Sequence, residues 1–123
     1  MKTLLLFIAI ALSINVFGQS TVKIGNLEVM TENLEGSKDW FEAVKACADL
    51  GDGWRLPTKE ELQMLYNNKD KIGGFASVGY WSSTESVSGR SAWWRIFGPA
   101  GYGGMSLSNK KLSMLGVRAV RSK

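Results

Sequence analysis

The segment at residues 53–62, GWRLPTKEEL, constrains the fold of this chain more than any other part of the sequence. Pro57 fixes its own φ at about −65° and keeps the residue before it extended, so a helix begins only after this position. Thr58 is a favourable N-cap residue, and Glu61, three positions later, completes a capping box. The segment therefore predicts an extended approach, a rigid turn and a helix that begins after Thr58.

The N-terminus has the three parts of a secretory signal peptide. Lys2 supplies a positive charge, residues 4–12 form an unbroken apolar run, and compact residues at Val16 and Gly18 mark a cleavage site before Gln19. The run is shorter than the roughly 20 residues of a membrane-spanning helix. We expect residues 1–18 to be removed and residues 19–123 to form one domain, secreted to the periplasm, the cell surface or the medium. An uncleaved N-terminal anchor is the alternative.

Charge is distributed unevenly along the chain. Residues 19–85 carry seven Lys or Arg and eleven Asp or Glu, whereas residues 86–123 carry seven Lys or Arg and no acidic residue. A basic C-terminal third favours anionic partners such as sulfated or acidic glycans, or phosphate-bearing surfaces. The alternative is that the acidic and basic halves neutralise each other across the folded surface. The basic third has no nucleic-acid-binding motif, so we expect no nucleic-acid partner.

Hydrophobic periodicity predicts a hairpin, two helices and then several short strands. The hairpin turn is Gly25-Asn26, and Gly51 is a natural stop for the first helix. No βαβ alternation occurs, which predicts an α+β fold with two helices packed beside short antiparallel β-sheets. The expected elements are a hairpin at 22–30, helices at 38–50 and 59–71, and strands at 80–83, 91–97, 105–108 and 117–121.

Five motifs follow one another in a fixed order: WFEA at 40–43, GWRLPTKEEL at 53–62, YWSSTE at 80–85, AW at 92–93 and VRAVR at 117–121. In this order they resemble the bacterial domain family found at the C-terminus of a collagen-like adhesin and among the Fibrobacter major paralogous domains. That family is a branch of the C-type-lectin-like fold and is related to the formylglycine-generating, sulfatase-modifying enzymes. The resemblance covers residues 21–121 and implies a C-type-lectin-like fold.

The sequence contains few of the residue types that catalysis requires. The sulfatase-modifying enzymes need a pair of cysteines late in the domain, whereas the single cysteine here, Cys47, lies on the first predicted helix, where we expect a buried, inert thiol. The chain has no histidine, which removes Ser-His-Asp triads and the usual zinc and iron sites. We therefore expect no enzyme activity and no cofactor, and instead a recognition module that binds a glycan or another anionic surface ligand, or a partner protein. The alternatives are a sulfatase-modifying-type oxidoreductase and a ligand-display variable protein of a diversity-generating retroelement.

Strand alternation at residues 92–97 indicates a binding face. It assigns Trp94 and Ile96 to the core and sends Trp93 and Arg95 to the opposite face, where an indole stacks on a sugar ring and a guanidinium pairs with an acid group. The alternative is that both indoles pack internally and Arg95 is an ordinary solvated charge. The expected ligand-binding residues are Arg90, Trp93, Arg95, Tyr102 and Lys110.

A second set of residues is expected to hold the fold together. Within this set Glu85 is the one carboxylate near the aromatic residues, and we expect it to form a salt bridge with Arg118 or Arg121 that ties down the last strand, rather than to act in acid–base chemistry. The expected structural residues are Trp54, Arg55, Pro57, Thr58, Glu61, Trp81, Glu85 and Arg118.

Overall fold

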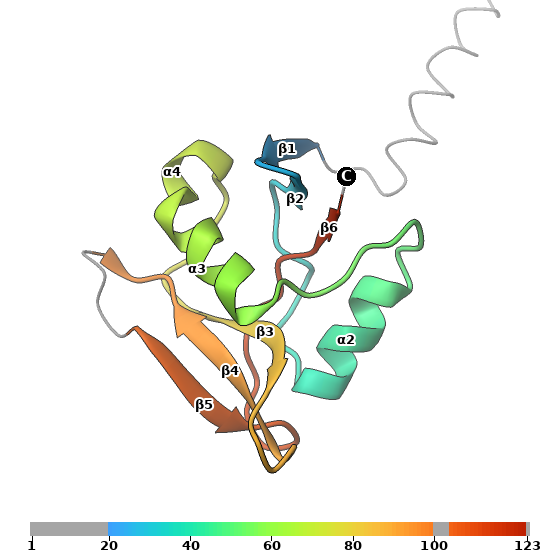
Figure 1. Ribbon diagram of the computed structural model, residues 1–123, viewed down its shortest axis with the longest axis vertical. Helices are drawn as coiled ribbons and strands as arrows, with labels where there is room; N and C mark the ends of the chain where they lie inside the picture. Colours follow the sequence, from blue (N-terminus) through green and yellow to red (C-terminus); the bar gives the residue numbers. More distant parts are fainter. Residues whose placement is uncertain (1–19, 100–103, 123) are drawn as a thin grey trace, which may run out of the picture.

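The computed structural model describes residues 20–99 and 104–122, and these form two small antiparallel sheets with helices beside them (Figure 1). The α+β class predicted from the sequence is confirmed, while the predicted signal peptide and Tyr102 lie outside the described residues. No helix in the described part has the length and apolar character of a membrane span. The elements are β1 (Thr21–Ile24), β2 (Leu27–Met30), α2 (Trp40–Ala48), α3 (Lys59–Asn67), α4 (Lys69–Ile72), β3 (Gly79–Glu85), β4 (Ser91–Ile96), β5 (Met105–Asn109) and β6 (Val120–Ser122).

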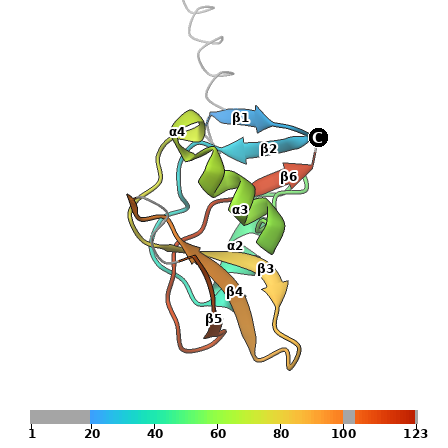
Figure 2. The same ribbon diagram turned by 60° about the vertical axis from the view of Figure 1, so that its left-hand side comes forward.

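The two sheets connect distant parts of the chain. The first has the order β1-β2-β6, so the N-terminal hairpin pairs with the last strand (Figure 2). The second has the order β3-β4-β5, with an irregularity in the β3–β4 register between Trp81 and Glu85. A bridge between Tyr80 and Gly116 joins β3 to the segment that leads into β6. Both sheets are therefore tied to the C-terminal segment.

Both main helices begin with a capping box. The Thr58 hydroxyl accepts from the Glu61 amide at 3.1 Å, and the Glu61 carboxylate accepts from the Thr58 amide at 2.9 Å, as predicted. Arg55 donates to the same carboxylate at 2.7 Å, and this hydrogen bond holds the pKa of Glu61 below its ordinary value. The first helix begins at Trp40 rather than at residue 38, because Asp39 provides its cap.

Two apolar clusters make up the core, one beside α2 and one beside α3 and α4. Trp81 is fully buried in the first cluster, and its indole N–H donates to the Lys38 carbonyl at 2.8 Å. Trp54 lies in the same cluster. The first cluster contains Met30, Ala43, Cys47, Trp54, Leu56, Trp81, Ala92, Val117 and Ala119. The second contains Leu27, Val29, Leu62, Leu65, Ile72, Tyr80, Phe97 and Val120.

Arg118 is a fully buried cation held by oxygen acceptors rather than by a carboxylate. Its guanidinium donates to the side chain of Asn33 at 2.7 and 3.0 Å, and to the carbonyls of Met30 and Gly73 at 2.9 and 3.0 Å. Burial lowers the pKa of Arg118 to about 10, so the group stays protonated at neutral pH. Arg118 thereby joins β2, the loop after α4 and the C-terminal segment.

The predicted salt bridge between Glu85 and Arg118 or Arg121 is wrong. Glu85 instead pairs with Lys110 at 2.5 Å, and Arg121 pairs with Glu28 at 2.7 Å. The physical reason is the position of Glu85 at the far end of β3, where it faces the residues that follow β5 and not the last strand. Glu85 therefore belongs to the surroundings of the candidate site described next.

Candidate ligand-binding site

The face of β4 that carries Arg95 is covered by α3, so the exposed face predicted for Trp93 and Arg95 is wrong for Arg95. Only 6 % of the Arg95 surface is exposed, and its guanidinium lies 3.7 Å from the centroid of the Tyr66 ring. Phe97, on the same face, lies in the second core cluster. A ligand therefore has no access to Arg95 along this face of the strand.

Trp93 is half-buried on the same side of the strand. The Lys59 ammonium, in the first turn of α3, lies 3.7 Å from the centroid of the Trp93 ring. On the other side of β4, Trp94 packs against the first core cluster and donates its indole N–H to the Ser108 hydroxyl at 2.7 Å. Trp94 and Ile96, both predicted for the core, are only partly buried, and the Trp93 ring is already covered by a cation of the chain itself.

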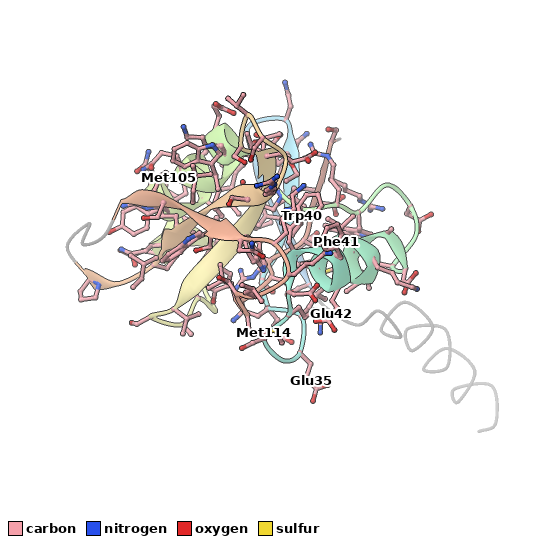
Figure 3. All side chains as sticks on the ribbon, turned by 90° about the horizontal axis from the view of Figure 1, so that it is seen from below. Glu35, Trp40, Phe41, Glu42, Met105 and Met114 are labelled. Carbon is pink, nitrogen blue, oxygen red and sulfur yellow. The ribbon has the colours of Figure 1, made fainter. Side chains whose placement is uncertain are left out.

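A basic pocket lies at the other end of the β3-β4-β5 sheet, where the β3–β4 turn meets the segment after β5 and the start of α2. Its volume is about 320 Å³, at the lower end of the range typical of ligand pockets. Trp40 and Phe41 stand together at this end of α2, whereas Met105 lies at the opposite end of β5 (Figure 3). The pocket is lined by Phe41, Gly89, Arg90, Asn109, Lys110 and Lys111.

Two tight turns position the exposed cations of this pocket. Asn109 ends β5, and its side-chain oxygen accepts from the amides of Lys111 and Leu112 at 2.8 and 3.2 Å, which bends the chain directly after the strand. On the neighbouring hairpin, Gly89 adopts a φ of 79°, a conformation that favours glycine, and places Arg90 directly before β4. The pocket walls are therefore held by backbone geometry.

Lys110 connects three elements at the base of the pocket. Its amide donates to the Arg90 carbonyl at 3.1 Å, and its carbonyl accepts from the Trp40 amide at 3.0 Å. Its ammonium pairs with Glu85 and lies 4.2 Å from the centroid of the Trp40 ring. Lys110 is 5 % exposed and has a fixed position, whereas Arg90 and Lys111 are exposed to solvent. The pocket thus combines one nearly buried cation, Lys110, with two solvent-exposed cations, Arg90 and Lys111.

The electrostatics of the pocket favour an anion. Three of the six lining residues are cations and none is acidic, so Glu85, which is half-exposed beside Lys110, is the nearest compensating charge in the described contacts. An ammonium has three donors, and the bond to Glu85 uses one of them. Phe41 is 49 % exposed and offers an apolar ring at the pocket wall. The arrangement can bind an acid group while a flat, partly apolar ring contacts Phe41.

The five residues predicted from the sequence to bind a ligand do not lie together in the structure. Arg90 and Lys110 line one pocket, Trp93 and Arg95 lie against α3, and Tyr102 is outside the described residues. Sequence reasoning missed Phe41, Asn109 and Lys111. Lys111 had a usable signal, because an asparagine before two lysines is typical of a turn that exposes the residues after it.

Other chemistry finds little support in the described residues. Cys47 is fully buried, and burial raises the pKa of its thiol to about 12, so it is protonated and shielded at neutral pH. Within residues 20–99 and 104–122, no group of three His, Cys, Asp or Glu side chains is placed to hold a metal ion. The basic pocket is therefore the arrangement on which we base a function.

Comparison with known proteins gives no family assignment. No protein-family model matches the chain, and no curated protein sequence matches it.

Proposed function

We propose that this chain is a secreted, non-enzymatic recognition module that binds an acidic glycan, or another anionic surface ligand, in the pocket formed by Arg90, Lys110, Lys111 and Phe41. The observation that carries the proposal is the grouping of three cations and one half-exposed aromatic ring around a pocket of about 320 Å³. The signal-peptide pattern at residues 1–18 supports an extracellular ligand. The zero histidine count and the buried state of Cys47 support binding rather than catalysis.

Glycans fit this chemistry for two reasons. A sugar ring has an apolar face that packs on an aromatic ring such as Phe41, and a sulfate or carboxylate accepts hydrogen bonds from Arg90 and the lysines. Exposed charge pairs contribute little one at a time, so recognition depends on several cations acting on one ligand. A ligand with both features on one residue, such as a sulfated or uronic-acid-containing glycan, uses the whole pocket.

The fold we propose within the α+β class is C-type-lectin-like. The sequence motifs that resemble the collagen-like-adhesin branch support it, as does the arrangement of two main helices beside two antiparallel sheets. In the folded chain the GWRLPT segment is structural, since Arg55 joins Glu61 and Val120 while Trp54 and Leu56 enter the first core cluster.

The test is retention of the purified protein on immobilised heparin and on a glycan array. The combined substitution Arg90→Glu and Lys111→Glu reverses two exposed charges without touching the core. We expect it to abolish retention at 0.15 M salt, on the order of a 30-fold or greater loss of affinity, as expected for two lost charge-assisted contacts.

The matched control reverses two exposed lysines elsewhere, Lys23→Glu and Lys71→Glu, and changes the net charge by the same amount. We expect this control to retain most of the affinity. Equal losses of affinity in the two variants would show that the protein is attracted by its overall charge alone. Unchanged retention of the pocket variant would show that the ligand does not bind in this pocket. Phe41→Ala tests the ring separately, and we expect it to weaken binding about 5-fold.

A further inference from the structure

Strand β5 forms the outer edge of the second sheet. The order β3-β4-β5 places no described strand beyond it, and Figure 1 shows it at the rim of the molecule. An edge strand presents unpaired N–H and C=O groups, which are a template for pairing with another strand. The direction of these groups decides whether β5 can serve that purpose.

The β4–β5 ladder fixes which residues face outward. The Lys110 amide donates to the Arg90 carbonyl at 3.1 Å, so these two form a hydrogen-bonded pair. Bonded and non-bonded pairs alternate along an antiparallel ladder, so Ser106 and Ser108 direct their backbone groups to β4. Met105, Leu107 and Asn109 therefore direct theirs to the open edge. Among the described residues, the backbone groups of Met105 and Leu107 have no partner on that side, whereas the Asn109 carbonyl accepts from the Ser113 amide.

Nothing in β5 discourages pairing with another strand. Its sequence, MSLSN, contains no charge and no proline, and its register with β4 is regular from end to end. The Leu107 side chain is 45 % exposed. The edge strand β1, by contrast, carries the exposed Lys23 at its centre. Charged residues and prolines are the usual means of blocking an edge, and β5 has neither.

We propose that β5 pairs in antiparallel fashion with β5 of a second copy of this chain, with Leu107 opposite Leu107. The strand is self-complementary about this residue, because Ser106 then faces Ser108 and Met105 faces Asn109. The outward groups of these residues match in direction. The Asn109 carbonyl already accepts from the Ser113 amide at 3.2 Å, so the free groups give four backbone hydrogen bonds: two between the Leu107 residues, and one from each Asn109 amide to the Met105 carbonyl of the other copy. The same register places Lys110 opposite Gly104, so no cation faces another across the join.

Two-fold pairing of this kind uses the same edge of both copies and stops at two. Five residues on each side make a small interface, of the class below about 1,200 Å² that gives weak, concentration-dependent association. Two leucine side chains and four hydrogen bonds favour a dimer that forms at high local concentration, such as on a ligand-coated surface.

The consequence for binding rests on the proposed function, although the pairing itself does not. Lys110 lies three residues from Leu107, so the two pockets of the dimer are offset by roughly 20 Å along the strand direction. Two pockets on one particle raise the apparent affinity for a repetitive surface by a factor on the order of 10² to 10⁴. A single-site ligand would show no such gain.

The test is sedimentation equilibrium of the purified protein without ligand. We expect the apparent mass to rise from one chain toward two between about 10 µM and 1 mM, as for other small interfaces. Leu107→Pro removes only an outward N–H and leaves every β4–β5 bond intact, so we expect it to fold and to remain a single chain. Leu107→Lys adds a charge at the join, and we expect the same result.

The control is Leu112→Lys, which changes another exposed leucine in the same way outside β5, and we expect it to associate like the unmodified chain. Circular dichroism melting confirms that each variant is folded. A single-chain mass at 1 mM, self-association of a folded Leu107→Pro or Leu107→Lys variant at the normal level, or growth beyond two copies would each overturn the proposal. Because the measurement uses no ligand, its failure leaves the proposed function intact.

Discussion

The substitution Glu85→Gln tests the charge balance of the pocket most directly. It removes the carboxylate beside Lys110 while keeping the size and shape of the side chain. An acid oxygen that bonds to the Lys110 ammonium at about 2.8 Å lies roughly 4.3 Å from the nearest Glu85 oxygen, since that oxygen is 2.5 Å from the same nitrogen, and the centres of the two negative charges are then about 5 Å apart. Like charges at this distance repel each other, so the natural carboxylate weakens anion binding.

The magnitude follows from Coulomb's law with a dielectric suited to a half-exposed group. At effective values between about 80 and 40, the repulsion across 5 Å is about 0.8 to 1.7 kcal/mol. We therefore expect Glu85→Gln to bind heparin about 4- to 17-fold more tightly at low salt. At 1 M salt the screening length is about 3 Å, so the difference between the two proteins should nearly vanish.

A second effect of the same substitution acts on the protein without ligand. Lys110 is nearly buried, so loss of its partner leaves a poorly solvated cation and lowers the melting temperature. A bound anion compensates that cation, and heparin should therefore raise the melting temperature of Glu85→Gln more than that of the unmodified chain. Titration calorimetry at two salt concentrations and melting with and without heparin provide the measurements.

The control is Asp70→Asn, which removes one exposed negative charge on α4, away from the pocket. We expect its affinity to stay within twofold of the unmodified chain. If Glu85→Gln binds no more tightly than this control at low salt, the ligand does not sit beside Lys110 and the reasoning fails.

Three further predictions concern stability. Arg118→Met removes the donor from three oxygen acceptors, one buried and two part-buried, and should cost about 3 kcal/mol, and Arg118→Lys should recover part of this, as measured by urea unfolding followed by tryptophan fluorescence. The pKa of Glu61 is lowered in the folded state, so its contribution is complete above the ordinary value of about 4.5 and is lost as the pH falls through the lowered value. The stability difference between the unmodified chain and Glu61→Gln should therefore shrink between pH 7 and pH 3, and a constant difference would contradict the assignment. Gly74→Ala places a Cβ 2.2 Å from the Thr31 carbonyl at a φ of 77° and should cost at least about 2 kcal/mol, whereas Gly25→Ala, with open space around it, should cost about 1.

Local sequence rules predicted those parts of the fold that depend on neighbouring residues. The Thr58–Glu61 capping box, the turn at Gly25-Asn26 and the two helical stretches each arise within a few residues, and the structure contains them, although the helix predicted at 59–71 is divided at Asn68 into α3 and α4. The last strand is shorter than predicted. Residues 117–119 form no ladder and make only single backbone hydrogen bonds, in which the Val117 carbonyl accepts from the Leu34 amide and the Ala119 carbonyl accepts from the Met30 amide.

The candidate site was predicted less well, for a physical reason. Alternation shows which residues of β4 share a face, but it does not show which faces are covered. Arg95 is buried because Tyr66 of α3 lies over it, and that contact joins residues that are distant in sequence. The partner of Glu85 depends in the same way on where the segment after β5 meets the end of β3. Such contacts require the tertiary structure.

The position of the basic pocket has a consequence for how sequences of this kind can diverge. Its exposed cations, Arg90 and Lys111, follow tight turns and belong to neither core cluster, and the turn tips beside them carry the exposed Val87 and Leu112. Substitutions at these four positions alter the charge and shape of the surface without disturbing packing. Ligand preference and folding stability are thus encoded by separate residues, so natural selection can change one without loss of the other.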